Sequence, residues 1–528
     1  METLLSEREF REISRYISEN LGLYFAPDRQ PDLERGLMSA GLEAGFEDVR
    51  LYVDHLLKSP IRKEQTNLLA LKLTIGETYF FRENRIFEIL KSDILPPLLK
   101  SKEKIRIWCA GCCTGEEPYS VAIAVDEMFP EERKKDVSIL GTDINTEFLK
   151  KAEEGIYGQW SFRNVPERIK SRYFTNVADK KFKIIPQIKK MVGFSYLNLI
   201  EDVFPSLLNE TNAMDVIFCR NVLLYFNKEG AIKVLDGFFN SLVEGGWFIP
   251  GMSELSHLKS PKFQSVNYPD SILYRKVSIP AASAAQAESH HQEDEKNRED
   301  GKSKSTLASP RHFNPTLSRL KEALSAKAQK LSLAKMKPSH AEKIEPGHEK
   351  SVKEENKSAT FNSARSLFEA GDYAGSAKEL EYLFGNKLLL KSEIDKSYIM
   401  ISKCYANLGD ILKAKKWCSE GLKTNKLNPI LYLLMCNLLQ EENKIAEATD
   451  AVKKAIYLNP DYIMAHFALA NIYRRSGGKK EALRHHKIAL DILNKMGEND
   501  IVQGSEGLSA GRLKEIILSS ISEGSAEK

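Results

Sequence analysis

The spacing of hydrophobic positions divides the chain into stretches of different character. Over residues 1–90 apolar positions recur at the spacing of a helix, and no run alternates as a strand would. One such helical face comprises Phe46, Val49, Tyr52, Val53, Leu56 and Leu57. The pattern predicts a small all-helical domain at the N-terminus.

Residues 91–278 instead alternate short apolar runs with helical stretches. The strand candidates are 105–108, 137–141, 191–197, 216–219 and 246–249. Strands that alternate with helices form a parallel, doubly wound sheet with helices on both faces. We therefore predict an α/β domain of the Rossmann-like type.

Residues 279–357 are rich in Ala, Ser, Lys, Glu and His and contain almost no aromatic residues. A chain of this composition buries too little apolar surface to offset the entropy lost on ordering, so we predict a disordered linker. Five of the ten histidines lie in the linker. They are His290, His291, His312, His340 and His348. Because they are dispersed, solvated side chains are favoured over a metal site.

Residues 358–496 are helical and repetitive. Ala414, Ala448 and Ala482 stand 34 positions apart, and such a fixed period predicts an array of helix hairpins rather than a plain bundle. The period, the Gly-Asp turns and Asn459-Pro460 resemble tetratricopeptide repeats, of which we count about four, the first irregular. The resemblance implies a groove for a protein or peptide partner, which the sequence does not identify. Residues 497–528 are predicted to be a C-terminal tail.

Composition narrows the possibilities further. A chain of 528 residues predicts two or three domains, and a net charge of +4 gives no general attraction to nucleic acid or membranes. No apolar run is long enough to cross a bilayer and the first residues are charged, so we expect a cytoplasmic protein without membrane insertion. Seven scattered cysteines suit free thiols in a reducing compartment. The Cys109-to-Cys112 spacing lacks a second ligand pair, so no metal site is predicted.

The segment 108–120 lies between a predicted strand and a predicted helix, and it carries the clearest chemical signal. Gly111 and Gly115 allow a sharp turn and a close approach of a ligand to the backbone. Glu116 and Glu117 stand where the helix begins, and two carboxylates there would repel a pyrophosphate. A cationic cofactor with ribose hydroxyls, such as S-adenosylmethionine, is therefore favoured. Generic use of a Rossmann-type loop, with both glutamates as ordinary helix N-terminal charges, remains the alternative.

Other polar side chains follow predicted strands at 141–145, 196–199 and 215–226, the edge of an α/β sheet where ligands bind. Asp143 is placed to accept hydrogen bonds from both ribose hydroxyls, or it caps a turn. Arg82 follows an apolar run in the junction segment 74–83, which suggests partial burial beside a carboxylate ligand, or else a side chain that extends along the surface.

Taken together, these segments resemble the CheR family, the chemoreceptor glutamate methyltransferases that use S-adenosylmethionine. The resemblance covers about residues 8–277 and rests on the segments 77–82, 114–120 and 219–226. It implies a class I methyltransferase domain over 91–278 with a small β-subdomain at about 174–198. It also implies that the cofactor is lined by Thr78, Arg82, Glu117, Asp143, Asn198, Leu199, Arg220 and Asn221. Arg82 and Tyr225 would flank the methyl transfer, although a lone tyrosine is more often a core residue.

The partners implied are the cytoplasmic helices of chemoreceptors with their methyl-accepting glutamates, which would bring the protein to receptor arrays. Three departures from the family matter. Gly76 stands where members usually have Asn, so one hydrogen bond to the cofactor is lost or replaced. Charges of both signs are mixed over residues 28–35, in the domain where members often offer a basic face to acidic receptor helices. The β-subdomain looks shorter than in members that grip a receptor's C-terminal peptide. We therefore expect receptor recognition that does not use a receptor's C-terminal peptide.

The expected reaction is methyl transfer to a glutamate carboxylate. A glutamate with a pKa of about 4.3 is already ionised at neutral pH, so no general base is required. Two alternatives stay open. A domain that binds the cofactor without turnover would leave the chain a repeat-based scaffold, while a small-molecule or nucleic-acid methyltransferase is disfavoured because basic patches with interleaved aromatics are missing.

Overall fold

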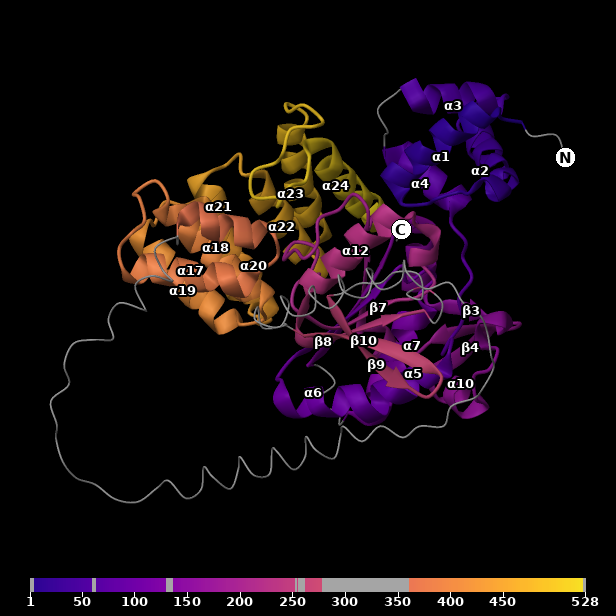
Figure 1. The fold of residues 1–528 in the computed structure, drawn as a ribbon, viewed down its shortest axis with the longest axis horizontal. Coiled ribbons are helices and arrows are strands. Elements are labelled where there is room, and N and C mark those ends of the chain that lie inside the picture. The colour runs from indigo at the N-terminus through magenta and orange to yellow at the C-terminus, as the bar shows by residue number, and fades with distance from the viewer. Residues whose placement is uncertain are drawn as a thin grey trace, which may run out of the picture. The chain divides into compact units, whose positions relative to one another are not determined.

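The computed structural model describes residues 4–58, 63–129, 136–251, 254, 262–277 and 360–525 (Figure 1). The predicted linker, 279–357, lies outside the described residues, as do its five histidines. No helix within the described ranges has the length and apolar character needed to cross a membrane.

The N-terminal domain is all-helical, as predicted. Its helices are α1 (Glu7–Leu21), α2 (Gln30–Glu43), α3 (Val49–Lys58) and α4 (Lys63–Leu73), with a short turn, η1 (Pro27–Arg29), before α2. Ser6 and Glu9 form a capping box that fixes the start of α1. The domain has its own core, in which Ile13, Leu37 and Tyr52 are fully buried.

That core ends at Leu73, and residues from Phe80 onward pack into the core of the sheet domain. The helical segments that follow are α5 (Asn84–Ile89), η2 (Leu90–Ile94) and α6 (Leu95–Ser101). Ile86 and Ile94 pack in the same cluster as the strand residue Ile107. We therefore propose a domain boundary between residues 73 and 80 rather than near residue 90.

The central sheet has seven strands in the order β6-β2-β1-β7-β8-β10-β9. Their bounds are β1 (Ile105–Ala110), β2 (Val137–Asp143), β6 (Val192–Tyr196), β7 (Met214–Cys219), β8 (Leu242–Pro250), β9 (Phe263–Tyr268) and β10 (Ser271–Lys276). The first five are mutually parallel and match the five predicted strands, which confirms the α/β fold class. The prediction of a wholly parallel sheet is wrong, because β9 and β10 form an antiparallel hairpin at the edge beyond β8.

Helices cover both faces of the sheet. On one face lies α7 (Glu116–Met128), which packs in one cluster with Ile107 and Val216. On the other lies α12 (Lys228–Ser241), whose Phe238 meets the fully buried Trp108. Successive strand residues point to opposite faces, so Trp108 and its neighbour Ile107 serve different layers. The helix α9 (Thr146–Glu154) follows β2.

A small antiparallel sheet stands beside the main one, in the order β3-β5-β4. Its strands are β3 (Ile156–Gly158), β4 (Phe174–Ala178) and β5 (Lys181–Ile184), with η3 (Gln159–Phe162), α10 (Glu167–Tyr173) and α11 (Pro186–Lys189) nearby. The predicted span of 174–198 therefore begins too late and ends too late, since β3 starts at residue 156 and β6 belongs to the main sheet.

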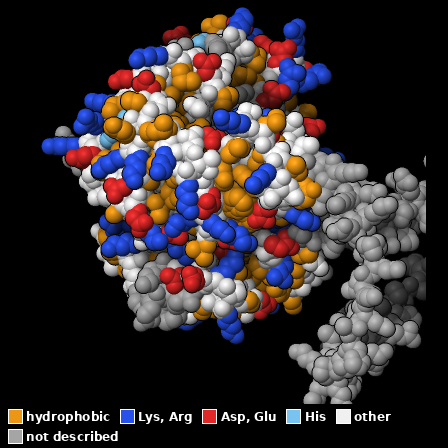
Figure 2. Space-filling view, turned by 90° about the vertical axis from the view of Figure 1, so that its left-hand side faces the viewer, with side chains coloured by type: hydrophobic (Ala, Val, Ile, Leu, Met, Phe, Trp, Pro, Cys, Tyr) orange, Lys and Arg blue, Asp and Glu red, His pale blue; other side chains and the backbone are white. Residues whose placement is uncertain are grey.

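The repeat domain consists, in the described part from residue 360, of four helix pairs. They are α16 (Phe361–Glu369) with α17 (Tyr373–Gly385), α18 (Ile394–Asn407) with α19 (Ile411–Thr424), α20 (Pro429–Glu441) with α21 (Ile445–Leu458), and α22 (Ile463–Arg475) with α23 (Lys479–Leu493). The three periodic alanines, Ala414, Ala448 and Ala482, are buried where paired helices meet, which confirms the repeat prediction. On the face shown in Figure 2, basic and acidic side chains are intermixed rather than separated by sign.

The segment after the repeats is not a simple tail. It contains a further helix, α24 (Ala510–Ser525), whose Ala510, Leu513 and Ile517 are fully buried in the same core as α22 and α23. Leu513 and Ile517 are four residues apart, so one apolar face of the helix packs against the last repeat. The prediction that 497–528 is a tail is therefore wrong for the helix.

Candidate functional site

A pocket of about 1050 Å³, open mouth included, lies at the carboxyl ends of β1, β2, β6 and β7. Its walls include all the predicted site residues: Thr78, Arg82, Glu117, Asp143, Asn198, Leu199, Arg220, Asn221 and Tyr225. Segments spread over almost 150 positions of the chain thus meet in one cavity. This is the edge at which open α/β sheets bind ligands.

The loop between β1 and α7 forms the floor of the pocket. Gly111 and Gly115 both adopt the left-handed backbone, with φ of 71° and 91°. A Cβ on Gly111 would lie 2.4 Å from the Val222 side chain, and one on Gly115 would lie 2.7 Å from Ala152. Glycine is therefore required at both positions, and α7 starts at Glu116 as predicted.

The two glutamates at the start of α7 have different roles. Glu116 turns into the protein, where its carboxylate accepts hydrogen bonds from Thr114 Oγ1 (2.6 Å) and Ser161 Oγ (2.9 Å). Only Glu117 lines the pocket. The adjacent carboxylates predicted to act together against a pyrophosphate are thus one structural group and one group in the cavity.

Glu117 forms a buried ion pair with Arg220, at 3.0 Å. Arg220 also pairs with Glu83 at 3.0 Å and donates to the carbonyl oxygen of Arg82 at 2.6 Å. Burial raises the pKa of Glu117, and Arg220 opposes that shift. The pair joins the junction segment, α7 and the end of β7 at one point of the pocket wall.

Asp143, the last residue of β2, caps turns and also lies in the pocket wall. Its Oδ2 accepts from Cys113 N and its Oδ1 from Asn145 N, both at 2.8 Å, so it fixes two turns. The same carboxylate lines the pocket. Burial raises its pKa to about 6, although hydrogen bonds from Asn145, Cys113 and Ile144 lower it. Each carboxylate oxygen has a further lone pair for a ligand hydroxyl.

The turn after β7 places Asn221 and Tyr225. Asn221 has a left-handed backbone, with φ of 59°, and its buried Oδ1 has no hydrogen-bond partner among the described residues. Tyr225 is half-buried, and its carbonyl oxygen accepts from Tyr24 N at 2.7 Å. The N-terminal domain is thereby tied to the rim of the pocket.

Glu254 holds this turn in place, and the sequence analysis did not single it out. Its Oε1 accepts from Val222 N (2.6 Å) and Leu223 N (2.9 Å), and its Oε2 accepts from Gly251 N (2.6 Å). An acidic residue just after the predicted strand 246–249 was the available signal. Glu254 therefore positions Asn221 without being a predicted ligand-binding residue itself.

The junction segment supplies Thr78 and Arg82, both half-buried. Arg82 Nη1 donates to the carbonyl oxygen of Glu77 at 2.9 Å, and its guanidinium lies 5.8 Å from the centre of the Tyr79 ring. The neighbouring Phe80 and Phe81 are buried in the sheet core. The apolar run thus anchors the segment and leaves the charge of Arg82 at the pocket.

Asn198 and Leu199 form another part of the pocket wall. The Asn198 side chain donates to the carbonyl oxygen of Asn20 at 2.7 Å and accepts from Ile200 N at 3.1 Å. Its amide is therefore engaged with the protein, and Asn198 shapes the wall. Leu21 and Leu23 of the N-terminal domain complete this side, which no local sequence pattern indicated.

These residues fit a cofactor that donates hydrogen bonds. The orphaned Asn221 Oδ1 and the buried Asp143 carboxylate are acceptors, suited to hydroxyl or ammonium donors and unsuited to phosphate. Phe87, Phe148 and Phe226 add aromatic surface to the walls. Ribose hydroxyls, an amino group and an adenine ring match this combination.

Comparison with known proteins agrees with this chemistry. Residues 76–272 match the family described as CheR methyltransferase, SAM binding domain. A chemotaxis protein methyltransferase of Borreliella burgdorferi is 33% identical over 256 residues, which cover 47% of this chain and 89% of that protein. Chemotaxis protein methyltransferase 2 of Vibrio cholerae is 31% identical over 255 residues, 48% of this chain and 87% of that protein.

Among solved structures, MamA 41-end from Desulfovibrio magneticus RS-1 is similar over 26% of this chain and 75% of its own, at 15% identity and a TM-score of 0.23.

The matched family segment contains the predicted site residues from Thr78 to Tyr225. S-Adenosylmethionine is therefore the cofactor of this domain.

Proposed function

Because the chain belongs to the CheR family of chemotaxis methyltransferases, we propose that it methylates glutamate side chains of methyl-accepting chemoreceptors. The observation that carries the proposal is the convergence of all nine predicted site residues on one cavity. The coarser statement needs no proposal: the chain is a methyltransferase of a chemotaxis family, with S-adenosylmethionine as its cofactor.

We assign the cofactor-binding roles as follows. Asp143 accepts from the ribose hydroxyls, and Asn221 Oδ1 accepts from a donor that its buried position otherwise lacks. Glu117, held by Arg220, supplies negative charge beside a cationic group. Thr78, Asn198 and Leu199 complete the walls.

When bound, the cofactor supplies a methyl group on a positively charged sulfur. The acceptor is a glutamate carboxylate that is already ionised at neutral pH, so the chain has to orient it and exclude water. Arg82 is proposed to hold one carboxylate oxygen while Tyr225 donates a hydrogen bond nearby. The cofactor held beside Arg82 and Tyr225 would give its methyl group to the glutamate oxygen, and the products would be a methyl ester and S-adenosylhomocysteine. Alignment of the acceptor carboxylate with the methyl group can lower the barrier by up to about 7–11 kcal/mol.

The test uses the purified chain, tritiated S-adenosylmethionine and membranes enriched in a candidate receptor. Glutamate esters release volatile methanol in base, whereas methylated nitrogen does not. Arg82→Ala is expected to abolish this signal while cofactor binding weakens much less. Arg85→Ala is the matched control, because Arg85 lies three residues further along and, among the described residues, pairs with the exposed Glu88. Near-normal transfer by Arg82→Ala would remove its assigned role.

A second candidate is a scaffold that binds the cofactor with little turnover. Gly76 motivates it, because the ring of Phe148 lies 2.8 Å from where a Cβ would stand and so occupies the space of the usual Asn side chain. The same assay separates the two candidates, since a scaffold binds the cofactor and yields no volatile counts.

In either case we propose that the four repeat pairs bind a protein or peptide partner, and that the chain works at receptor arrays.

A further inference from the structure

The repeat domain packs on the sheet domain through the turns inside its helix pairs, and both belong to one compact unit. The contacts pair Gly371 with Asn240, Gly409 with Val243, Glu441 with Arg106 and Arg475 with Glu210. All four pairs therefore present the same edge to the sheet domain. The last contact reaches the segment between β6 and β7, which also forms part of the pocket wall.

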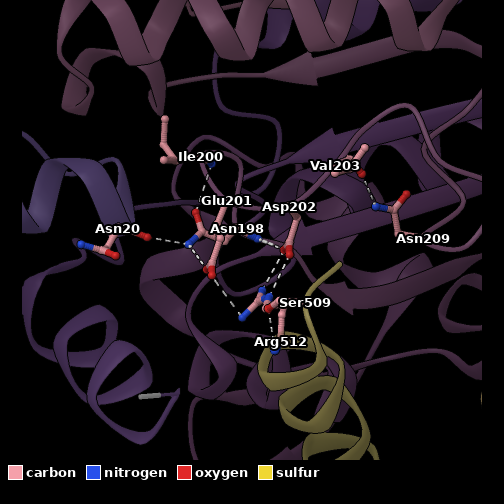
Figure 3. Close-up of polar contacts among 9 residues, drawn as sticks. All are labelled: Asn20, Asn198, Ile200, Glu201, Asp202, Val203, Asn209, Ser509 and Arg512. Carbon is pink, nitrogen blue, oxygen red and sulfur yellow. Dashed lines mark hydrogen bonds and ion pairs between the residues drawn. The ribbon is translucent and has the colours of Figure 1, made fainter. Parts of the chain in front are cut away.

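The helix α24 reaches the same segment with a buried charge. Arg512 donates from Nε to Asp202 Oδ1 and from Nη2 to Asp202 Oδ2, both at 2.8 Å (Figure 3). The side chains of Arg512 and Asp202 are only 4% and 5% exposed. Arg512 also lies 3.9 Å from Glu201 Oε2, and its guanidinium stands 4.6 Å from the centre of the Tyr196 ring. Two parallel hydrogen bonds fix the direction of the carboxylate as well as its position.

Asp202 and Glu201, which Arg512 holds, both form hydrogen bonds with Asn198. Asp202 Oδ2 accepts from Asn198 N at 2.7 Å, and Glu201 Oε2 accepts from Asn198 Nδ2 at 3.3 Å. The Asn198 side chain continues to the carbonyl oxygen of Asn20 on α1 (Figure 3). A continuous row of polar contacts thus joins α24, the β6–β7 segment and the N-terminal domain, with the pocket residue Asn198 at its centre.

The electrostatics of Arg512 support a persistent ion pair with Asp202. Burial would lower the pKa of Arg512, but Tyr196 and Asp202 outweigh it and raise the pKa above its ordinary value. A guanidinium in this setting stays charged throughout the working pH range, and its removal would leave Asp202 buried without its cation.

We propose that Arg512 is a positioning residue for cofactor binding: through Asp202 and Glu201 it sets the place of Asn198, so that the affinity for S-adenosylmethionine depends on how α24 is seated. The repeat domain and the pocket then share the β6–β7 segment, the first through Asp202 and the second through Asn198. The inference rests on the cofactor assigned to this pocket, and it concerns a residue far outside the segment that matches the methyltransferase family.

The test is calorimetric titration of the full chain with S-adenosylhomocysteine, which requires no receptor. Arg512→Met is expected to raise the dissociation constant about tenfold, within the range of couplings between linked sites. Arg512→Lys keeps the charge but not the paired hydrogen bonds, so a smaller increase is expected. Arg475→Met is the matched control, because Arg475 pairs with Glu210 on the same segment, away from the pocket.

Hydrogen exchange separates positioning from general loss of structure. The amides of Asn198 and Asp202 are expected to exchange faster in Arg512→Met, while those of α22 keep their protection. If Arg512→Met does not fold, Arg512→Lys against Arg475→Met decides the question alone. Equal dissociation constants for the Arg512 variants and the control would overturn this inference only. Absence of binding by the unsubstituted chain would overturn the cofactor assignment as well.

Discussion

The pocket and the repeat domain use their residues in opposite ways. In the pocket each position has its own task, as where Arg220 joins Glu117 to Glu83 or Asp143 fixes two turns at once. In the repeats one requirement recurs, namely a small residue such as Ala448 where paired helices cross. A substitution in the pocket therefore removes a particular interaction, whereas one in the repeats fills a space that must stay small.

The largest effect is expected where a pocket interaction is both charged and buried. Arg220→Met leaves Glu117 and Glu83 without their shared cation, and breaking a buried pair in this way costs about 3–5 kcal/mol. Native-state hydrogen exchange of the β1 and β7 amides measures the loss as a fall in their opening free energy.

The control for this variant is Arg85→Met, which removes an exposed pair with Glu88 and should cost at most about 1 kcal/mol. If the two variants lose similar amounts, the Arg220 pair contributes no more than a surface pair. The contrast between the pocket and the repeats would then lose its main support.

A repeat position should show a smaller loss of a different origin. Ala448 is fully buried, so Ala448→Leu is expected to overpack the crossing of α20 and α21 and to cost about 1–3 kcal/mol in the stability of the repeats. Ala446→Leu, at an exposed position of the same helix, should cost almost nothing. Hydrogen exchange of α20 and α21 measures both, and equal protection in the two variants would contradict the packing argument.

The pocket segments were predictable because their information is local. Gly111, Gly115 and Glu117 follow one strand within seven positions, Asp143 ends a second strand, and Asn221 stands just beyond a third. A strand end marks the ligand edge of the sheet whatever the rest of the fold does. The repeats were predictable for another reason, since a period survives even where single helices are ambiguous.

What the sequence left out depends on packing between distant segments. Leu21 and Leu23 reach the pocket only because the N-terminal domain lies against it. Arg512 meets Asp202, outside the pocket, only because α24 packs on the last repeat. The β9–β10 hairpin was missed because edge strands are half exposed, so their polar residues hide the apolar pattern. None of these residues carries a local signal of where it will lie.

Acidity tests whether a pocket residue acts as a charge. The pKa of Asp143 is raised to about 6, so below that pH it is increasingly protonated and accepts hydrogen bonds poorly. If only the carboxylate form binds, the dissociation constant for S-adenosylhomocysteine rises about tenfold between pH 7 and pH 5. Calorimetry over this range should show the rise in the unsubstituted chain, and Asp143→Asn should bind weakly with little change over the same pH range.

Acid unfolding caused by protonation of Asp143 cannot explain such a loss of affinity at low pH. A raised pKa means that the folded chain holds this proton more tightly than the unfolded chain, so protonation of Asp143 below pH 6 stabilises the fold. A flat affinity profile in the unsubstituted chain would show that Asp143 acts in the turns alone, and would make this pocket residue as purely structural as a repeat alanine.

The smallest effect is expected at Gly76, which stands beside the pocket and, like a repeat alanine, has little space for a larger side chain. Gly76→Asn restores the residue usual in the family, yet a Cβ there would lie 2.8 Å from the Phe148 ring, so the new side chain has to displace that ring. A neutral hydrogen bond contributes about 0.5–1.5 kcal/mol, and the displacement offsets most of it, so cofactor affinity should change by less than about tenfold. Gly76→Asn combined with Phe148→Ala should bind more tightly than Phe148→Ala alone, because the space is then free. Calorimetry of the three variants decides this. Tighter binding by Gly76→Asn alone would show that a hydrogen bond, and not the space occupied by Phe148, is what this position lacks.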